Sequence, residues 1–122
     1  MPLAIAVALA AAAGAVCRYL LDQVVQRRHD SVLPIGTLVI NVTGSFVLGL
    51  LTGLSIHHGL GGTGLAVAAT GFLGGYTTWS TFAFESVALM QAGAVWEASV
   101  NLVASLGLGL LAAAAGLAAA LW

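Results

Sequence analysis

Long apolar segments with almost no charge constrain this chain more than any other feature of its sequence. Of its 122 residues, 61% are hydrophobic and only 6% are charged. A soluble domain carries roughly 25% charged residues. Because so few charges cannot cover a water-facing surface, we expect lipid to be the main solvent. The net charge of −1 gives no indication of nucleic-acid binding.

The apolar segments are long enough to cross a membrane as helices. Spanning about 30 Å of hydrocarbon takes roughly 20 residues at 1.5 Å each. The first segment lacks a basic n-region and continues past Arg18, so we interpret it as a retained helix rather than a signal peptide. The sequence predicts one all-α, four-helix transmembrane domain over residues 1–122, with helices at approximately 3–25, 35–56, 65–92 and 95–121.

The third predicted helix has an unusual centre. Gly74 and Gly75 are followed by a run of hydroxyl residues at 77–81. Glycines and hydroxyl side chains favour local unwinding. In lipid, unwound backbone is tolerated only where protein or a water-filled cavity satisfies it. We therefore expect a break near 74–78, which is a candidate ion site. The alternative is an intact helix with a glycine-packed contact.

Neutral polar side chains recur at helical spacing within two of the predicted spans. Thr37, Asn41 and Ser45 share one face of the second helix, and Asn101 and Ser105 are four residues apart on the fourth. Hydroxyls and amides can donate to an anion without holding it through a fixed charge, so that it can leave again. The alternatives are hydroxyls bonded to their own helices and an Asn41 that joins two helices.

Two charged residues within the predicted spans, Arg18 and Glu85, can each have one of two roles. Arg18 precedes Asp22 by four residues, so the two can pair on one helix face. Alternatively, Arg18 attracts anions to a vestibule. Glu85 lies well inside the third span and needs partners or neutralisation, as a hydrogen-bond hub or as a proton carrier.

Three stretches of the sequence together resemble the Fluc/CrcB family of fluoride channels, and they come in the family's order. They are Gly14-x-x-x-Arg18-Tyr19, then Gly36-Thr37-Leu38-x-x-Asn41-x-x-Gly44-Ser45-Phe46-x-x-Gly49, then Gly71-Phe72-x-Gly74-Gly75-x-Thr77-Thr78-Trp79-Ser80-Thr81-Phe82-x-x-Glu85. The second and third stretches are long enough to be specific, whereas the first alone would be weak.

The resemblance implies an assembly. Family members are antiparallel, dual-topology dimers of four-helix subunits, with the third helix broken at its centre. Two anion pores run along the subunit interface. A structural sodium ion is held at the dimer centre by backbone carbonyls, which in this sequence would be those of Gly74 and Thr77. The expected partners are thus fluoride, the lipid bilayer and a second subunit.

The resemblance also implies pore residues. The positions that match the family's pore are Asn41, Ser80, Thr81, Phe82 and Ser105. Two positions depart from the family. Trp79 stands where a first pore phenylalanine is usual, and Asn101 stands where a tyrosine is common. We expect Trp79 to line the pore in place of the phenylalanine.

These inferences predict a fluoride-selective channel that exports the anion passively across the cell (inner) membrane. One alternative is a small proton-coupled multidrug-type antiporter, for which Glu85 is the remaining candidate carboxylate. Another is a structural or assembly subunit of a larger complex. No nucleophile–base set or metal-ligand cluster is visible in the sequence, so we do not expect an enzyme.

The positions of the arginines indicate whether the second subunit of the dimer can be a copy of this chain. An antiparallel homodimer needs little Lys/Arg bias between the two sides of the membrane. Arg27 and Arg28 lie in the loop between the first two helices, and the opposite side has no Lys or Arg. This bias is only two arginines, but no basic residue on the opposite side balances it. A homodimer is favoured by the resemblance, and a heterodimer with an oppositely oriented homologue is the alternative.

Overall fold

The structure is a computed structural model that describes residues 2–122, and it is helical almost throughout. Within these residues, three helices are long and apolar enough to cross a membrane: α1 (Pro2–Arg28), α2 (Ile35–His58) and α6 (Val95–Ala119). Between α2 and α6 the chain forms α3 (Gly62–Leu65), the π-helical segment η1 (Ala66–Leu73), α4 (Gly74–Tyr76) and α5 (Trp79–Gln91). The all-helical class is therefore confirmed.

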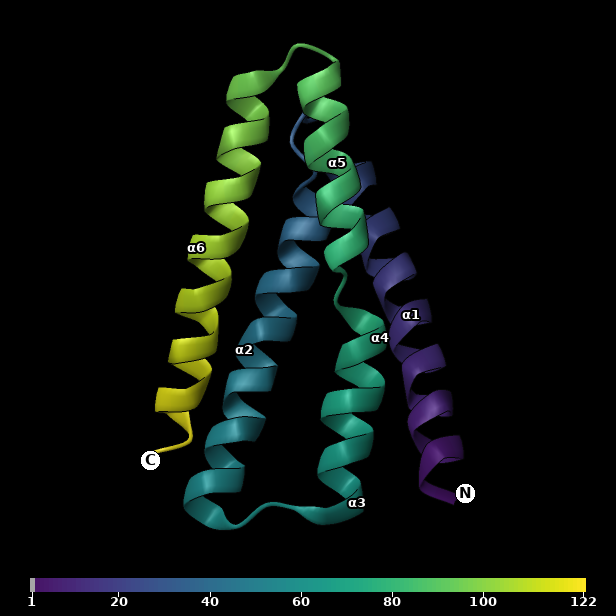
Figure 1. Ribbon diagram of the computed structural model, residues 1–122, viewed down its shortest axis with the longest axis vertical. Coiled ribbons are helices and arrows are strands. Elements are labelled where there is room, and N and C mark those ends of the chain that lie inside the picture. The colour runs from purple at the N-terminus through teal and green to yellow at the C-terminus, as the bar shows by residue number, and fades with distance from the viewer. Residues whose placement is uncertain (1) are drawn as a thin grey trace.

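The helices form two packed pairs (Figure 1). The first pair is α2 with α6, and the second is α1 with η1 and α4. Helix α5 continues beyond α4 and packs against the first half of α6. Both chain ends and the α2–α3 connection lie at one end of the molecule, whereas the α1–α2 and α5–α6 connections lie toward the other. This is the arrangement that four membrane crossings require.

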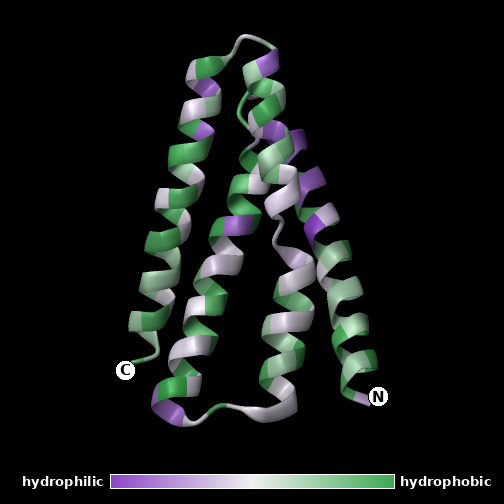
Figure 2. Cartoon of the chain, in the orientation of Figure 1, coloured by the Kyte–Doolittle hydropathy of each residue, from purple (hydrophilic) through white to green (hydrophobic). Residues whose placement is uncertain are grey.

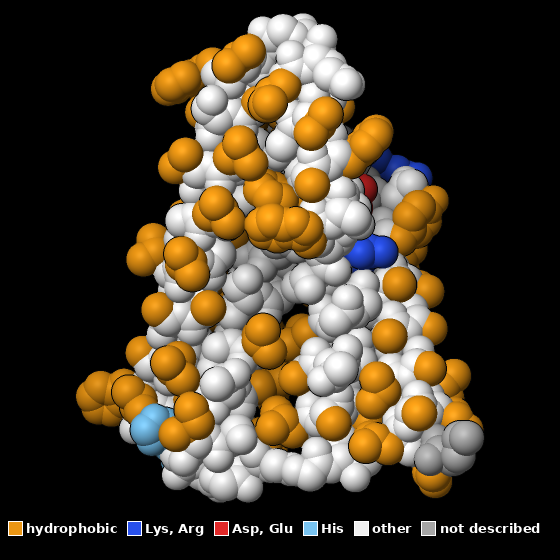
Figure 3. Space-filling view, viewed as in Figure 1, with side chains coloured by type: hydrophobic (Ala, Val, Ile, Leu, Met, Phe, Trp, Pro, Cys, Tyr) orange, Lys and Arg blue, Asp and Glu red, His pale blue; other side chains and the backbone are white. Residues whose placement is uncertain are grey.

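Hydropathy follows the same division into ends and middle. In Figure 2 hydrophilic residues concentrate at the end of α1 and at the end of α2, and hydrophobic residues follow most of the helix lengths. The space-filling view in Figure 3 shows a surface of hydrophobic and uncharged groups with few charged side chains. Such a surface suits contact with lipid along the helices.

Glycines allow both helix pairs to pack closely. A Cβ atom at these positions would meet the backbone of the neighbouring helix, so only glycine fits without a shift. In lipid, small residues promote association because they let helix backbones approach. At the α2–α6 contact the glycines are Gly49, Gly53 and Gly116, and at the contact of α1 with η1 and α4 they are Gly14, Gly71 and Gly75.

The helix stops between α4 and α5. Thr77 (φ −78°, ψ 158°) and Thr78 (φ −146°, ψ 121°) have extended backbones. The Thr78 hydroxyl then accepts a hydrogen bond from the Thr81 amide at 3.1 Å, which caps the first turn of α5. Residues 66–73 form a π-helix, a rare form that often marks functional sites and that our sequence analysis did not predict.

Candidate functional site

A cleft of about 430 Å³ separates the α2–α6 pair from η1, α4 and the start of α5. We call it the central cleft, and an opening in this part of the molecule is visible in Figure 3. None of the 16 described residues that line it is charged. Its polar and aromatic lining residues are Asn41, Ser45, Thr77, Thr78, Trp79, Phe82 and Ser105.

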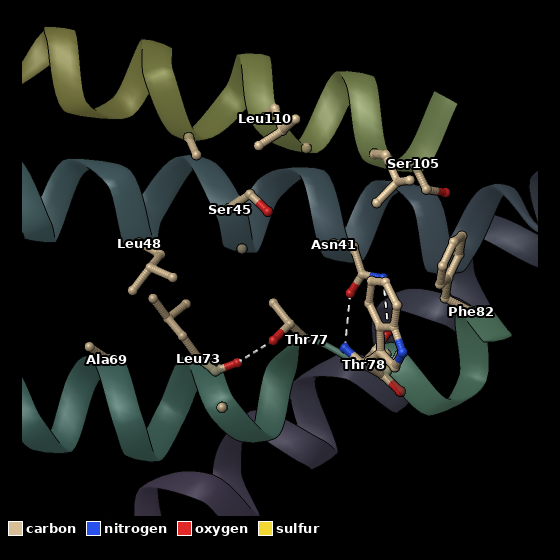
Figure 4. Close-up of a pocket in the computed structure, with 16 residues that line it drawn as sticks. Asn41, Ser45, Leu48, Ala69, Leu73, Thr77, Thr78, Phe82, Ser105 and Leu110 are labelled. Atoms are coloured by element: carbon tan, nitrogen blue, oxygen red, sulfur yellow. Dashed lines mark hydrogen bonds between the residues drawn. The ribbon is translucent and has the colours of Figure 1, made fainter. Parts of the chain in front are cut away.

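Asn41 joins α2 to the extended residues between α4 and α5. Its Nδ2 donates to the Thr78 carbonyl, and its Oδ1 accepts from the Thr78 amide, both at 2.9 Å. Figure 4 shows the Asn41 side chain reaching across the cleft wall to Thr78. An amide nitrogen has two N–H groups, so the second is available to donate elsewhere. Asn41 therefore links α2 to the extended residues, and its side chain also lines the central cleft.

The pairing with Asn41 frees the Gly74 carbonyl. The Thr78 amide would close a helical turn on that carbonyl, but it donates to Asn41 instead. Gly74 and Thr77 both line the central cleft. The two residues predicted to offer carbonyls to sodium thus flank the short helix α4, Gly74 as its first residue and Thr77 directly after it.

Arg18 reaches the same segment from α1. Its Nη1 donates to the Thr77 carbonyl at 3.4 Å. Asp22, the partner considered for Arg18 in the sequence, accepts a hydrogen bond from Gln26 at 2.9 Å. The Arg18 guanidinium therefore places a positive charge beside the extended residues, and it does not line the cleft.

Trp79 and Phe82 form an aromatic pair at the start of α5. Their ring centroids are 5.1 Å apart with a tilt of 56° between the planes. Phe82 is 4% exposed, whereas Trp79 is 71% exposed in the single chain. Both line the central cleft, so Phe82 lies in its wall and Trp79 at its open side.

Ser80 and Thr81 lie outside the central cleft lining. They cluster with Thr78, whose hydroxyl lies 3.3 Å from Ser80 Oγ and 3.0 Å from Thr81 Oγ1. Both are exposed, whereas Thr78 is buried and lines the cleft. Sequence reasoning did not include Thr78 among the pore residues, although its position beside the expected break was a usable signal.

Ser105 lines the central cleft from α6, but Asn101 does not. Asn101 is 5% exposed and donates from Nδ2 to Ser86 Oγ on α5 at 2.9 Å. The sequence analysis placed Asn101 on the same helix face as the expected pore residue Ser105. In the structure its side chain instead joins α5 to α6 inside the subunit.

Glu85 also lies outside the central cleft. Its Oε1 accepts a hydrogen bond of 2.8 Å from Thr37, a residue that is 4% exposed. This contact joins α2 to α5, whereas the buried Oε2 of Glu85 has no hydrogen-bond partner among residues 2–122. Among residues 2–122, no group of three or more His, Cys, Asp or Glu side chains is placed to hold a metal ion.

Comparison with known proteins adds an independent finding. Residues 5–117 match the family described as CrcB-like protein, Camphor Resistance (CrcB). The chain is 48% identical over 113 residues to "Fluoride-specific ion channel FluC 1" of Leifsonia xyli subsp. xyli, which covers 93% of this chain and 82% of that protein. It is 48% identical over 112 residues to the protein of that name in Streptomyces avermitilis, covering 89% and 90%. It is 40% identical over 117 residues to "Fluoride-specific ion channel FluC" of Geobacter sulfurreducens, covering 95% and 94%.

Proposed function

Because this chain belongs to the CrcB family of fluoride-specific ion channels, we propose that it conducts fluoride passively out of the cytoplasm through pores that include the central cleft. Its relatives are named as channels, and the chain is not an enzyme. The proposed location is the cell (inner) membrane. The spans are α1, α2, α6 and the composite of α3 to α5, which is broken at Thr77 and Thr78.

The observation that carries the proposal is a largely apolar cleft in which a few neutral hydrogen-bond donors are placed and no side chain is charged. Fluoride is small and strongly hydrated, so a pore must replace its water with close donors. The Asn41 amide and the Ser45 and Ser105 hydroxyls are such donors. Because none carries a fixed charge, the ion is held weakly enough to leave, as conduction requires.

The aromatic pair supports a second element of the proposal. Ring edges are weakly positive and can face an anion. Phe82 lies in the cleft wall, and the exposed Trp79 lies against it at the open side of the cleft. We propose that a second subunit in the opposite orientation covers this side, which gives two pores along the interface of an antiparallel dimer. The proposed pore residues are Asn41, Trp79, Ser80, Thr81, Phe82 and Ser105.

The carbonyls of the two residues that flank the interior of α4, Gly74 and Thr77, suit a structural sodium ion. The Gly74 carbonyl has lost the Thr78 amide as its helical donor. The Thr77 carbonyl accepts one hydrogen bond from Arg18 and keeps a second lone pair. We propose that these two carbonyls hold sodium where two antiparallel subunits meet, so that the ion ties their extended segments together. Arg18 then weakens sodium binding by repulsion and also attracts anions to the vestibule.

A proton-coupled antiporter is less well supported. That chemistry needs a carboxylate in the transport cavity to exchange protons. Glu85 is bonded to Thr37 and does not line the central cleft. A heterodimeric fluoride channel is the other alternative, because Trp79 and Asn101 depart from the family's usual residues.

Flux from liposomes that contain only this protein tests the proposal. Purified protein should release fluoride much faster than chloride, with no proton gradient present and with potassium carried by an ionophore. A fluoride electrode and a chloride electrode record the initial rates. Equal rates for the two anions would reject a selective channel, and flux that appears only with a proton gradient would support the antiporter.

A further inference from the structure

Two buried polar side chains lie between α5 and α6 behind the wall of the central cleft. Ser86 is 4% exposed and Asn101 is 5% exposed. Neither residue lines the cleft. A buried polar group is unfavourable unless it is hydrogen bonded. The partners of Ser86 and Asn101 therefore indicate what the pair holds in place.

The hydrogen bonds of this pair end on two residues of the cleft wall. Ser86 Oγ donates to the Phe82 carbonyl at 2.8 Å, and Asn101 Nδ2 donates to Ser86 Oγ at 2.9 Å. At the other end, Ser105 Oγ donates to Asn101 Oδ1 at 3.5 Å. Phe82 and Ser105 both line the central cleft. One chain of hydrogen bonds thus connects the backbone of Phe82 on α5 with the hydroxyl of Ser105 on α6.

The direction of every bond in this chain follows from the Phe82 carbonyl. A carbonyl oxygen only accepts, so the single proton of Ser86 is used on it. Ser86 must then accept from Asn101, which requires the NH₂ end of the amide to face α5. The amide oxygen is left facing Ser105, where it can only accept. The Ser105 proton is therefore oriented by a residue that does not touch the cleft.

The length of the last bond matters for function. At 3.5 Å it is the longest of the three and near the limit for a hydrogen bond. The Ser105 hydroxyl can therefore turn toward an anion in the cleft at little loss, and it turns back to Asn101 when the anion leaves.

We propose that Asn101, oriented by Ser86, is a positioning residue that holds the Ser105 proton away from the cleft while no anion is bound, so that it competes with fluoride for this proton and does not contact the ion itself. This inference rests on the proposed function. It predicts that Asn101 and Ser105 act on one quantity, the fluoride concentration at which flux is half saturated. A merely structural role for Asn101 would lower the number of active channels, and therefore the maximal rate, without changing the half-saturating concentration.

The test is a double-mutant cycle on purified protein in liposomes, with Asn101→Leu, Ser105→Ala and the double variant. Ser105→Ala should raise the half-saturating fluoride concentration roughly five- to tenfold, the effect of one lost hydrogen bond. Asn101→Leu should lower this concentration by a smaller factor, because the long bond of 3.5 Å no longer competes for the Ser105 proton. The double variant should match Ser105→Ala, because Asn101 acts only through Ser105. Ser86→Ala should shift the half-saturating concentration in the same direction as Asn101→Leu.

Ser99→Ala is the matched control. Ser99 is exposed on the same helix and donates to the Val95 carbonyl of its own helix at 2.9 Å, so this change should leave the half-saturating concentration unaltered. If Asn101→Leu does not assemble, the cycle of Ser86→Ala with Ser105→Ala decides, because Ser86→Ala leaves α6 unchanged.

The outcomes separate the inference from the proposed function. Multiplying effects of Asn101 and Ser105, or a fall in maximal rate alone, would overturn the positioning role. Absence of fluoride flux from the unmodified protein would overturn the proposed function, and the inference with it. Opposite shifts of the half-saturating concentration in the two single variants support both, provided that the Asn101 effect is lost in the Ser105→Ala background and that the Ser99 variant is unchanged.

Discussion

The Asn41 side chain and the Thr78 backbone exchange two hydrogen bonds, each 2.9 Å long. The pairing resembles the way two strands satisfy each other, with an amide side chain in place of one backbone. It occurs where Thr77 and Thr78 leave the helical path, and so where backbone groups in a membrane would otherwise lack partners. Asn41 is therefore part of the scaffold as well as part of the cleft wall.

This dual role predicts that Asn41→Ala lowers both stability and fluoride flux. Two backbone groups of Thr78 would lose their partner, at about 1–3 kcal/mol for each group left unsatisfied. The melting temperature in detergent and the initial fluoride efflux rate measure the two effects. Thr52→Val is the control, because Thr52 is exposed on the same helix and bonds to the Leu48 carbonyl at 2.8 Å. Unchanged stability of the Asn41 variant would contradict the scaffold role.

The adjacent glycines of α4 should respond differently to the same substitution. A Cβ at Gly75 would meet the Ala11 backbone on α1, whereas a Cβ at Gly74 meets nothing within 4 Å. Gly75→Ala should therefore destabilise the protein by about 1–3 kcal/mol through overpacking. Gly74→Ala is the matched control for a methyl group at this turn. Thermal unfolding and size-exclusion profiles compare them, and equal behaviour would argue against the close α1–α4 contact.

Glu85 separates a channel from a proton-coupled transporter. Glu85→Gln keeps a carbonyl oxygen that can accept the Thr37 hydrogen bond, which is 2.8 Å long, and it removes the carboxylate. Because Glu85 lies outside the central cleft, fluoride flux should stay within about twofold of the unmodified rate, less than the loss of one hydrogen bond would cause. The liposome efflux assay measures the rate. Complete loss of transport would instead support a proton-coupled antiporter that uses the Glu85 carboxylate.

Removal of sodium should weaken the assembly. If the Gly74 and Thr77 carbonyls hold sodium, replacing it by a large organic cation should lower the melting temperature of the purified protein. Arg18→Gln removes the positive charge that lies 3.4 Å from the Thr77 carbonyl, so the stabilisation should then require less sodium. A sodium titration of thermal stability for both proteins measures this. Identical stability in the two cations for the unmodified protein would count against the site.

Single cysteines can report the orientation in cells. Asp30 and Gly61 lie in connections at opposite ends of the molecule (Figure 1). In a Cys17→Ser background, which removes the one native thiol, Asp30→Cys and Gly61→Cys are each exposed to an impermeant thiol reagent on intact cells. An antiparallel homodimer predicts partial labelling of both. Labelling of Gly61→Cys alone would require an oppositely oriented partner subunit.

Composition and periodicity alone determined much of this protein. The near absence of charge required lipid as solvent, and the lengths of the apolar segments predicted the helices that became α1, α2 and α6. Thr77 and Thr78 have extended backbones between α4 and α5, in a part of the chain where glycines and hydroxyl residues, which favour departure from a helix, cluster. These properties depend on residues that are close together in the chain.

Only the tertiary structure decided which side chains meet. The pairing of Asn41 with Thr78, the contact of Arg18 with the Thr77 carbonyl and the turn of Asn101 toward Ser86 each join different helices or segments. Helical spacing shows that residues share a face, but the neighbour of that face depends on how each helix is rotated and how closely it approaches the next. Here the glycine contacts between helix backbones set that approach, and they placed Ser105 in the cleft wall and Asn101 behind it.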